Sequence, residues 1–131
     1  MTQLKGTPIE GGKALEDLTT REIIHVMVKV QRLRHDKVAD LKNLTIALAK
    51  AKQAATEEHA KAFLRHEGPQ EERTQVAKLA AANAVFAMDA AKGQVDGCKA
   101  SMDILKDDWD TCRSAGANER AVRSATEGFG S

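Results

Sequence analysis

The sequence predicts an all-α fold: a long, coiled-coil-like antiparallel helical hairpin with a short C-terminal helix, assembling into a helical bundle. Two observations predict it. Apolar residues recur every three or four positions along two long stretches, as on one face of a helix. Gly68 and Pro69 separate the two stretches, and such a pair ends one helix and lets the next begin. Because the connection is short, the two helices should be antiparallel neighbours.

Residues 1–18 are predicted to form an N-terminal arm. Its few apolar residues, among them Leu15 and Leu18, leave docking and disorder equally open. The hairpin is predicted over 19–116, with its first helix at about 20–67. Thr19 and Glu22 have the spacing of a capping box, in which each side chain accepts a hydrogen bond from the other residue's backbone N–H.

A seam of apolar residues runs along one face of the first helix. At Arg34-His35-Asp36-Lys37 the apolar spacing is interrupted, and the seam moves around the helix as it does at a coiled-coil stutter. Its members are Ile23, Met27, Val30, Leu33, Val38, Leu41, Leu44, Leu48, Ala51, Ala55 and Ala62. Residues 23–30 are apolar nearly all round, so we expect this segment to be buried on more than one side.

The second helix is predicted at about 70–114 and carries two apolar stripes. The first keeps a strict four-three alternation through Ala77, Ala81, Ala84, Met88, Ala91, Val95, Cys98, Met102, Leu105, Trp109 and Cys112. The second lies nearly opposite and consists of Leu79, Phe86, Ala90, Gly93, Gly97, Ala100 and Ile104. One neighbouring helix cannot cover both stripes. We therefore expect a homo-oligomer, with a dimer favoured, whose interface is the second stripe.

Folding the chain about Gly68 predicts which residues meet. Leu44 is expected beside Gly93, Leu48 beside Ala90 and Ala51 beside Phe86, so that large residues face small ones. The same folding sets Lys29, Arg32 and Arg34 near Asp103, Asp107, Asp108 and Asp110 as a salt-bridge layer. Residues 117–131 are predicted to form a short helix, capped by Asn118 and folding back near Trp109, followed by a flexible tail.

Composition narrows the class of protein. A chain of 131 residues with 42% apolar residues and a net charge of +1 predicts one cytoplasmic domain with no overall field for nucleic acid or membranes. The longest apolar runs are far shorter than the ~20 residues that cross a bilayer. Cys98 and Cys112 lie about 21 Å apart along one helix, so we expect buried, reduced thiols.

No catalytic, cofactor or metal site is predicted. The four histidines lack the i, i+4 spacing that places two imidazoles on one zinc ion, and the cysteines lack CxxC spacing. His59 and His66 are interpreted as solvated residues near the hairpin tip. No glycine-rich phosphate loop follows a strand, and no nucleophile occupies a recognisable turn. We therefore expect a protein that is not an enzyme.

The residues Trp-Asp-Thr-Cys-Arg-Ser at 109–114, closing a long heptad helix, resemble the end of small all-helical accessory proteins of actinobacterial phages. This resemblance implies a virus-encoded, non-enzymatic protein that modulates a host protein or assists phage DNA metabolism. It implies no site residues.

Two functions remain open. The first is an interaction protein that binds a protein partner through the hairpin and self-associates through the second helix. The alternative is a nucleic-acid-binding accessory protein in phage DNA metabolism. Its contacts would be Lys29, Arg32, Lys37, Lys42, Arg113, Arg120 and Arg123.

Overall fold

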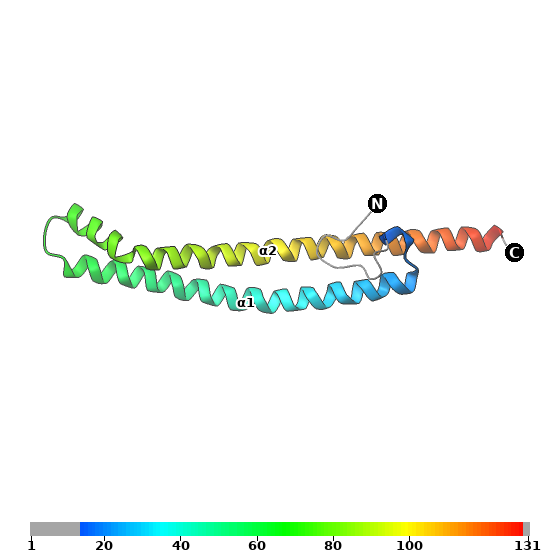
Figure 1. The fold of residues 1–131 in the computed structure, drawn as a ribbon, viewed down its shortest axis with the longest axis horizontal. Helices are drawn as coiled ribbons and strands as arrows, with labels where there is room; N and C mark the ends of the chain where they lie inside the picture. Colours follow the sequence, from blue (N-terminus) through cyan, green and yellow to red (C-terminus); the bar gives the residue numbers. More distant parts are fainter. Residues whose placement is uncertain (1–13, 130–131) are drawn as a thin grey trace. The chain divides into compact units, whose positions relative to one another are not determined.

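A computed structural model describes residues 14–129 and confirms the all-α hairpin. The elements are the 3-10 turn η2 (Leu15–Asp17), the helix α1 (Thr20–Arg65) and the helix α2 (Gln70–Phe129) (Figure 1). The chain forms two compact units. We call residues 39–99 the hairpin unit, and the described residues up to 38 and from 100 onward the terminal unit.

The capping box predicted at the start of α1 is confirmed. The N–H of Glu22 donates to the Thr19 hydroxyl oxygen at 3.3 Å, and the N–H of Thr19 donates to a Glu22 carboxylate oxygen at 3.3 Å. These bonds occupy backbone donors that have no partner inside the first helical turn. Glu22 also places a negative charge at the positive end of the helix dipole.

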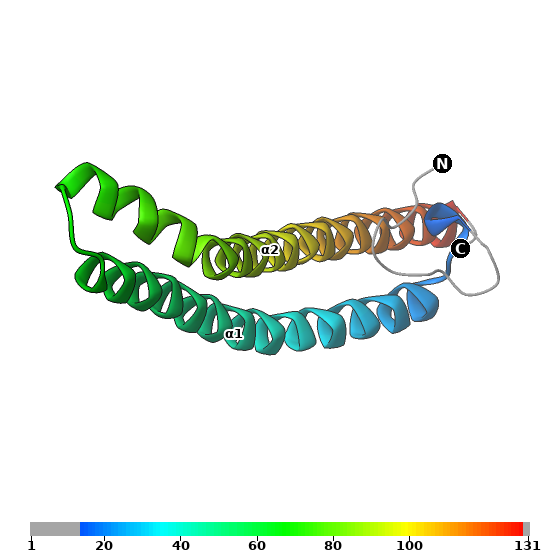
Figure 2. The ribbon, with the colours of Figure 1, turned by 60° about the vertical axis from the view of Figure 1, so that its left-hand side comes forward.

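In the hairpin unit, α1 and α2 are joined by the short connection predicted at Gly68 and Pro69 (Figure 2). Gly68 has φ +146°, a conformation that glycine adopts without steric cost. Helix α1 ends at Arg65, two residues before the predicted boundary. At the start of α2, the N–H of Arg73 donates to the Pro69 carbonyl at 3.0 Å.

The seam of α2 is confirmed, because each of its predicted residues is buried or half-buried. The seam of α1 is confirmed except at Val38, which is 54% exposed. Lys37 is half-buried and lies four residues after Leu33 and four before Leu41. Lys37 therefore takes the seam position at the stutter in place of Val38. Its aliphatic stem can lie against apolar neighbours while its ammonium group reaches water.

Two predictions were wrong: that the second helix ends at about residue 114, and that a separate short helix, capped by Asn118, lies within 117–131. Helix α2 continues through Gly116 to Phe129. One glycine inside a helix costs only about 1 kcal/mol relative to alanine, so it need not break the helix. A Cβ at the buried Gly116 would lie 3.7 Å from Cγ2 of Ile23, so α1 and α2 approach closely there.

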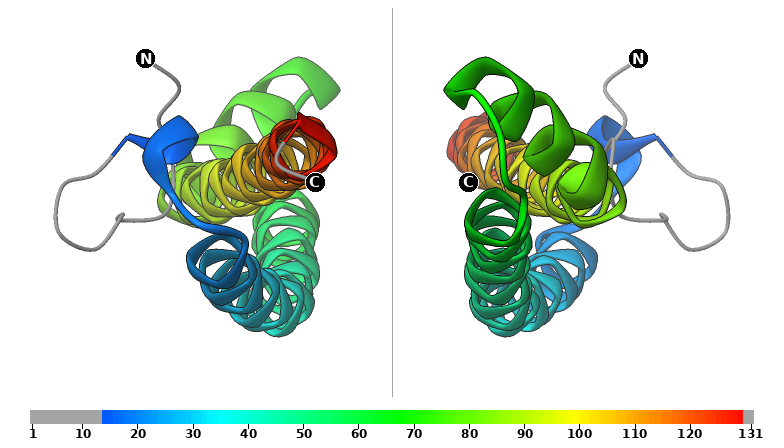
Figure 3. Two further views of the ribbon diagram at one scale, coloured as in Figure 1. Left: turned by 90° about the vertical axis from the view of Figure 1, so that its right-hand side faces the viewer. Right: turned by 90° about the vertical axis from the view of Figure 1, so that its left-hand side faces the viewer.

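The core of the terminal unit is completed by the N-terminal segment. Leu15 and Leu18 are 1% and 4% exposed, and they pack with Ile23, Val30 and Cys112. Figure 3 shows η2 beside α2 and the short segment that then leads to the start of α1. The end of the predicted arm is thus docked. Residues 1–13, and Gly130 and Ser131 of the predicted tail, lie outside the described residues.

The predicted pairing of large with small residues in the hairpin unit was wrong. Phe86 is 77% exposed, and no atom lies within 4 Å of a Cβ built on Gly93. The four-three seam of α2, which includes Ala77, Ala81 and Val95, is the buried face instead. Because the second stripe lies opposite this seam, it faces outward.

Candidate interaction surfaces

The second stripe of α2 is an exposed apolar face. In the hairpin unit it contains Leu79, which is 79% exposed, and Phe86, followed by the exposed small residues Ala90, Gly93 and Gly97. In the terminal unit the same stripe continues with Ala100 and Ile104, which are also exposed. Scattered exposed apolar residues are normal in proteins, but Leu79 and Phe86 share one helix face at heptad spacing.

The hairpin tip is held by a stack of three side chains that sequence reasoning missed. The guanidinium of Arg73 lies 4.3 Å from the centroid of the Phe63 ring, and Arg73 Nε donates to the Phe63 carbonyl at 3.0 Å. The His59 and Phe63 rings are stacked with centroids 6.5 Å apart. Such a cation–π contact contributes about 0.5–1 kcal/mol at an exposed site.

The two histidines of the tip are half-buried, so the interpretation of His59 and His66 as solvated residues was only partly correct. Nε2 of His66 lies 3.0 Å from a carboxylate oxygen of Glu72 across the connection. Among the described residues, no three metal-binding side chains gather in one place. His66 thus links the connection to α2, whereas His59 stacks on Phe63 within α1.

An apolar groove lies in the terminal unit between α1 and Trp109. It is lined by the apolar residues Ile24, Met27 and Val28 and by the polar residues Gln31, Arg32 and His35, and has a volume of about 610 Å³. Ile24 and Val28 are 55% and 52% exposed. The expectation that segment 23–30 is buried on more than one side therefore holds for Ile23, Val26 and Val30 but was wrong for Ile24 and Val28.

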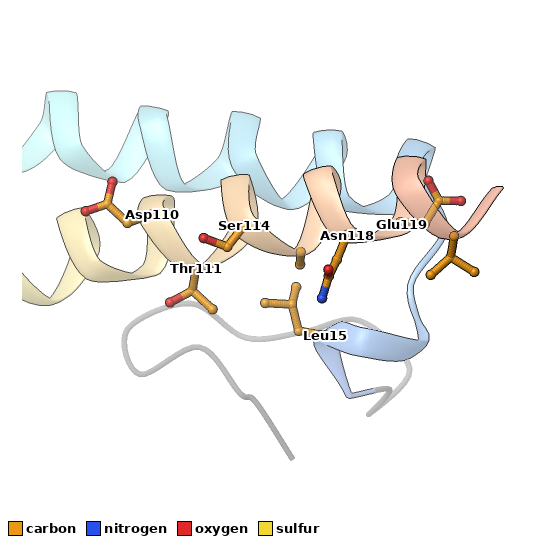
Figure 4. A pocket seen from close by; sticks show the side chains of 8 residues that line it. Leu15, Asp110, Thr111, Ser114, Asn118 and Glu119 are labelled. Carbon is orange, nitrogen blue, oxygen red and sulfur yellow. The ribbon is translucent and has the colours of Figure 1, made fainter. Parts of the chain in front are cut away.

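A more polar hollow of the terminal unit lies where η2 meets α2 (Figure 4). Leu15 contributes from η2, and Thr111, Ser114 and Asn118 contribute from α2. Glu119, at its edge, accepts hydrogen bonds from the Thr20 hydroxyl and from Arg123 Nη2, the latter at 2.7 Å. These bonds tie the start of α1 to the last turns of α2.

The basic residues considered for nucleic-acid contact do not share one environment. Lys29 and Lys37 are half-buried, whereas the rest are exposed. Lys42 belongs to the hairpin unit and the other six belong to the terminal unit: Lys29, Arg32, Lys37, Arg113, Arg120 and Arg123. Arg113 lies 3.7 Å from Asp110, and Arg123 is bonded to Glu119. Two of the three C-terminal arginines therefore already have carboxylate neighbours on α2.

Cys98 and Cys112 are buried and form no disulfide, as predicted. Burial raises the pKa of the Cys112 thiol from an ordinary 9.0 to about 11, and the negative charge of Asp108 adds to the effect. A thiol with a raised pKa is a poor nucleophile at neutral pH. Asp108 itself is 2% exposed, although its place in a run of acidic residues is typical of a solvated surface.

Comparison of the chain with protein-family models, with curated proteins and with solved structures gives no match. None of the described helices has the length and apolar character to cross a bilayer.

Proposed function

We propose that this chain is a non-enzymatic helical interaction protein, which self-associates through α2 and binds a protein partner. The exposure of Leu79 and Phe86 on the outer face of α2 supports this proposal most directly. Covering a side chain of this size contributes roughly 1.5–3 kcal/mol. An aromatic side chain in the middle of an interface is also a typical binding hot spot.

The self-association is tested by measuring the mass of the reduced protein in solution by light scattering over a range of concentrations. The wild type should form a dimer or a larger species, and Phe86→Glu should dissociate it, because a carboxylate would be buried without a partner. Ala47→Glu is the matched control, since Ala47 is exposed on α1 of the same unit. A wild type that stays monomeric at every concentration would refute self-association.

The partner is proposed to bind the apolar groove of the terminal unit. The side chains of Ile24, Met27 and Val28 form an apolar strip at helical spacing, which suits the apolar face of a second helix. The positive charge of Arg32, which also lines the groove, favours acidic side chains on that helix. The resemblance of residues 109–114 to phage accessory proteins accords with a phage or bacterial protein that meets this partner in the host cytoplasm.

Two synthetic amphipathic peptides test the groove, one with glutamates and one with lysines beside the same leucine face. Trp109 lines the groove and is the only tryptophan in the chain, so its fluorescence reports binding. The acidic peptide should bind more tightly, and Val28→Glu should abolish binding while Ala121→Glu, at an exposed position of α2, should not. Equal binding of both peptides, or of neither, would refute an acidic helical partner.

A further inference from the structure

We propose that the second copy docks parallel and in register on the outer face of α2 in the hairpin unit, so that Asn83 of each copy faces Asn83 of the other. This inference rests on the proposed self-association and goes further, because it names the direction and the register of the two helices. The apolar residues of the face supply the contact, and its one polar side chain chooses between the possible arrangements.

Asn83 lies within the outer apolar face of α2. With it, the exposed residues of this face follow a strict alternation of four and three residues: Leu79, Asn83, Phe86, Ala90, Gly93 and Gly97. At ~100° per residue, all six lie within an arc of ~80° that is centred opposite Ala81 and Val95 of the buried seam. The hairpin unit therefore presents a second coiled-coil seam to solvent.

The order of residues in this second seam is typical of parallel, two-stranded coiled coils. Leu79 and Phe86 occupy d positions, and Asn83 and Ala90 follow them at a positions. A single asparagine at an a position fixes the register and the number of strands of such pairs. In a parallel pair each a residue faces its own copy, so the two Asn83 amides can bond to each other, because an amide both donates and accepts hydrogen bonds.

An antiparallel pair leaves the Asn83 amide without a partner. In that arrangement an a residue of one helix faces a d residue of the other, and the d residues of this face are Leu79, Phe86 and Gly93. None of these three has a polar side chain. Burying an amide without a hydrogen bond is unfavourable, so Asn83 disfavours every antiparallel register within the face.

The residues on the two flanks of the face also favour the parallel pair. Asp89 and Asp96 lie on one flank, and Ala87 and Gln94 lie on the other. In a parallel pair each flank faces the opposite flank of the other copy, so Asp89 lies beside Gln94, whose amide can donate to the carboxylate. In an antiparallel pair centred on Gly93, Asp89 would instead face Asp96, and two like charges would repel each other.

The parallel register also keeps the large apolar side chains within the hairpin unit. Leu79 and Phe86, which are 79% and 77% exposed in one chain, each meet the same residue of the other copy. Toward the C-terminal end of the unit, a Cβ on Gly93 or Gly97 would meet no atom within 4 Å. Glycine and alanine there let the two helices approach closely.

Disulfide cross-linking tests the direction. Leu79→Cys and Ala90→Cys are made as separate full-length variants and oxidised in a glutathione buffer, at a concentration at which the reduced variant is dimeric. In the parallel dimer each introduced cysteine lies beside its own copy, so both variants should become covalent dimers. Leu64→Cys, at an exposed position of α1 in the same unit, is the matched control and should not cross-link. The wild type, whose two cysteines are buried, should not cross-link either.

An antiparallel dimer could not give this result. There the distance between one residue and its own copy along the helices is twice the distance of that residue from the two-fold axis. Positions 79 and 90 lie roughly 16 Å apart along α2, so at least one of them would lie roughly 16 Å or more from its copy. A disulfide joins Cα atoms that are no more than about 7 Å apart.

Mixing charged variants tests the contact between the two Asn83 side chains. Asn83→Asp alone, or Asn83→Lys alone, would bring two like charges together, so each should self-associate about tenfold more weakly than the wild type. In a mixture of the two variants, aspartate faces lysine, and native mass spectrometry should detect clearly more mixed dimer than the half that random pairing gives. Asn43→Asp and Asn43→Lys, at an exposed position of α1, carry the same changes in charge and should pair at random.

The expected result is therefore covalent dimers of both cysteine variants, together with preferential mixing at position 83. Cross-linking of only one cysteine variant, or of neither, would overturn the parallel register but leave self-association standing. Mixing at position 83 in the same proportion as at position 43 would do the same. A wild type that is monomeric would overturn both.

Discussion

Replacing Gly93 by alanine should stabilise the isolated chain, although it alters an exposed position that contacts nothing in the hairpin unit. Alanine is favoured over glycine inside a helix by about 0.8–1.0 kcal/mol, because the glycine backbone loses more freedom on folding. The added methyl group meets no atom within 4 Å, so no clash offsets this gain. For a chain of this length the gain should raise the melting temperature by about 3–6 °C.

The measurement is thermal unfolding followed by circular dichroism in the Phe86→Glu background, where association should make no contribution. Gly68→Ala is the contrasting substitution. Its φ of +146° is unfavourable for alanine, and the Cβ would lie 3.2 Å from a Glu72 carboxylate oxygen. We expect this change to destabilise the chain by roughly 1–3 kcal/mol. If Gly93→Ala lowered the melting temperature as well, the outward, unobstructed position of Gly93 would be wrong.

In the wild-type background, Gly93→Ala should have the opposite effect on assembly. Gly93 lies on the outer face of α2 proposed for self-association, where glycine allows a second helix to approach closely, so a methyl group on each copy would push the two helices apart. The same substitution should therefore raise the melting temperature of the monomer and raise the Kd of the dimer. An unchanged Kd would place the interface elsewhere.

Three further changes test the terminal unit. Thr19→Ala should cost about 1 kcal/mol through loss of the capping box with Glu22, whereas Thr19→Ser should restore most of it, both measured by denaturant unfolding. Leu15→Ala should cost about 2–5 kcal/mol because Leu15 is fully buried, whereas Leu64→Ala, at a position 76% exposed, should change the free energy of unfolding by less than about 0.5 kcal/mol. The third change concerns pH. The folded state binds the Cys112 thiol proton more tightly than the unfolded state does, so its contribution to stability is complete below pH 9.0 and is lost as the pH rises to about 11. Cys112→Ala should lose less stability than the wild type between these two pH values, and equal losses would contradict the raised pKa.

The sequence predicted those features of the fold that depend on local chemistry. The capping box, the connection at Gly68 and the four-three seam of α2 each follow from residue type and spacing within a few turns of helix. The end of α2 could not be predicted in this way. Gly116 resembles a helix stop, but it is buried against Ile23, and only the packing of α1 on α2 reveals that role.

Sequence reasoning was also limited where a contact joins segments that are separated in the chain. Leu15 and Leu18 precede the first helix in a region rich in glycine, so nothing in the sequence decided between docking and disorder. The structure places both side chains in the core with Ile23 and Val30. The stack of His59, Phe63 and Arg73 was missed for a similar reason, since Arg73 meets Phe63 only after the chain has turned.

The two units differ in how their apolar residues are used, and this difference bears on assembly. The buried residues of the terminal unit include Leu15, Ile23 and Val30, whose side chains each remove a large apolar area from water. The hairpin unit buries mainly small side chains, among them Ala55, Ala77 and Ala81. Three of its large apolar side chains, those of Leu64, Leu79 and Phe86, are 76%, 79% and 77% exposed.

An alanine seam lets α1 and α2 approach closely but contributes little apolar burial, because each side chain has a single methyl group. Burying Leu79 and Phe86 against a second copy would add two large side chains to the apolar burial of this unit. Self-association through α2 would then serve stability as well as recognition, since the face left open by one hairpin is the face on which another hairpin can complete its core.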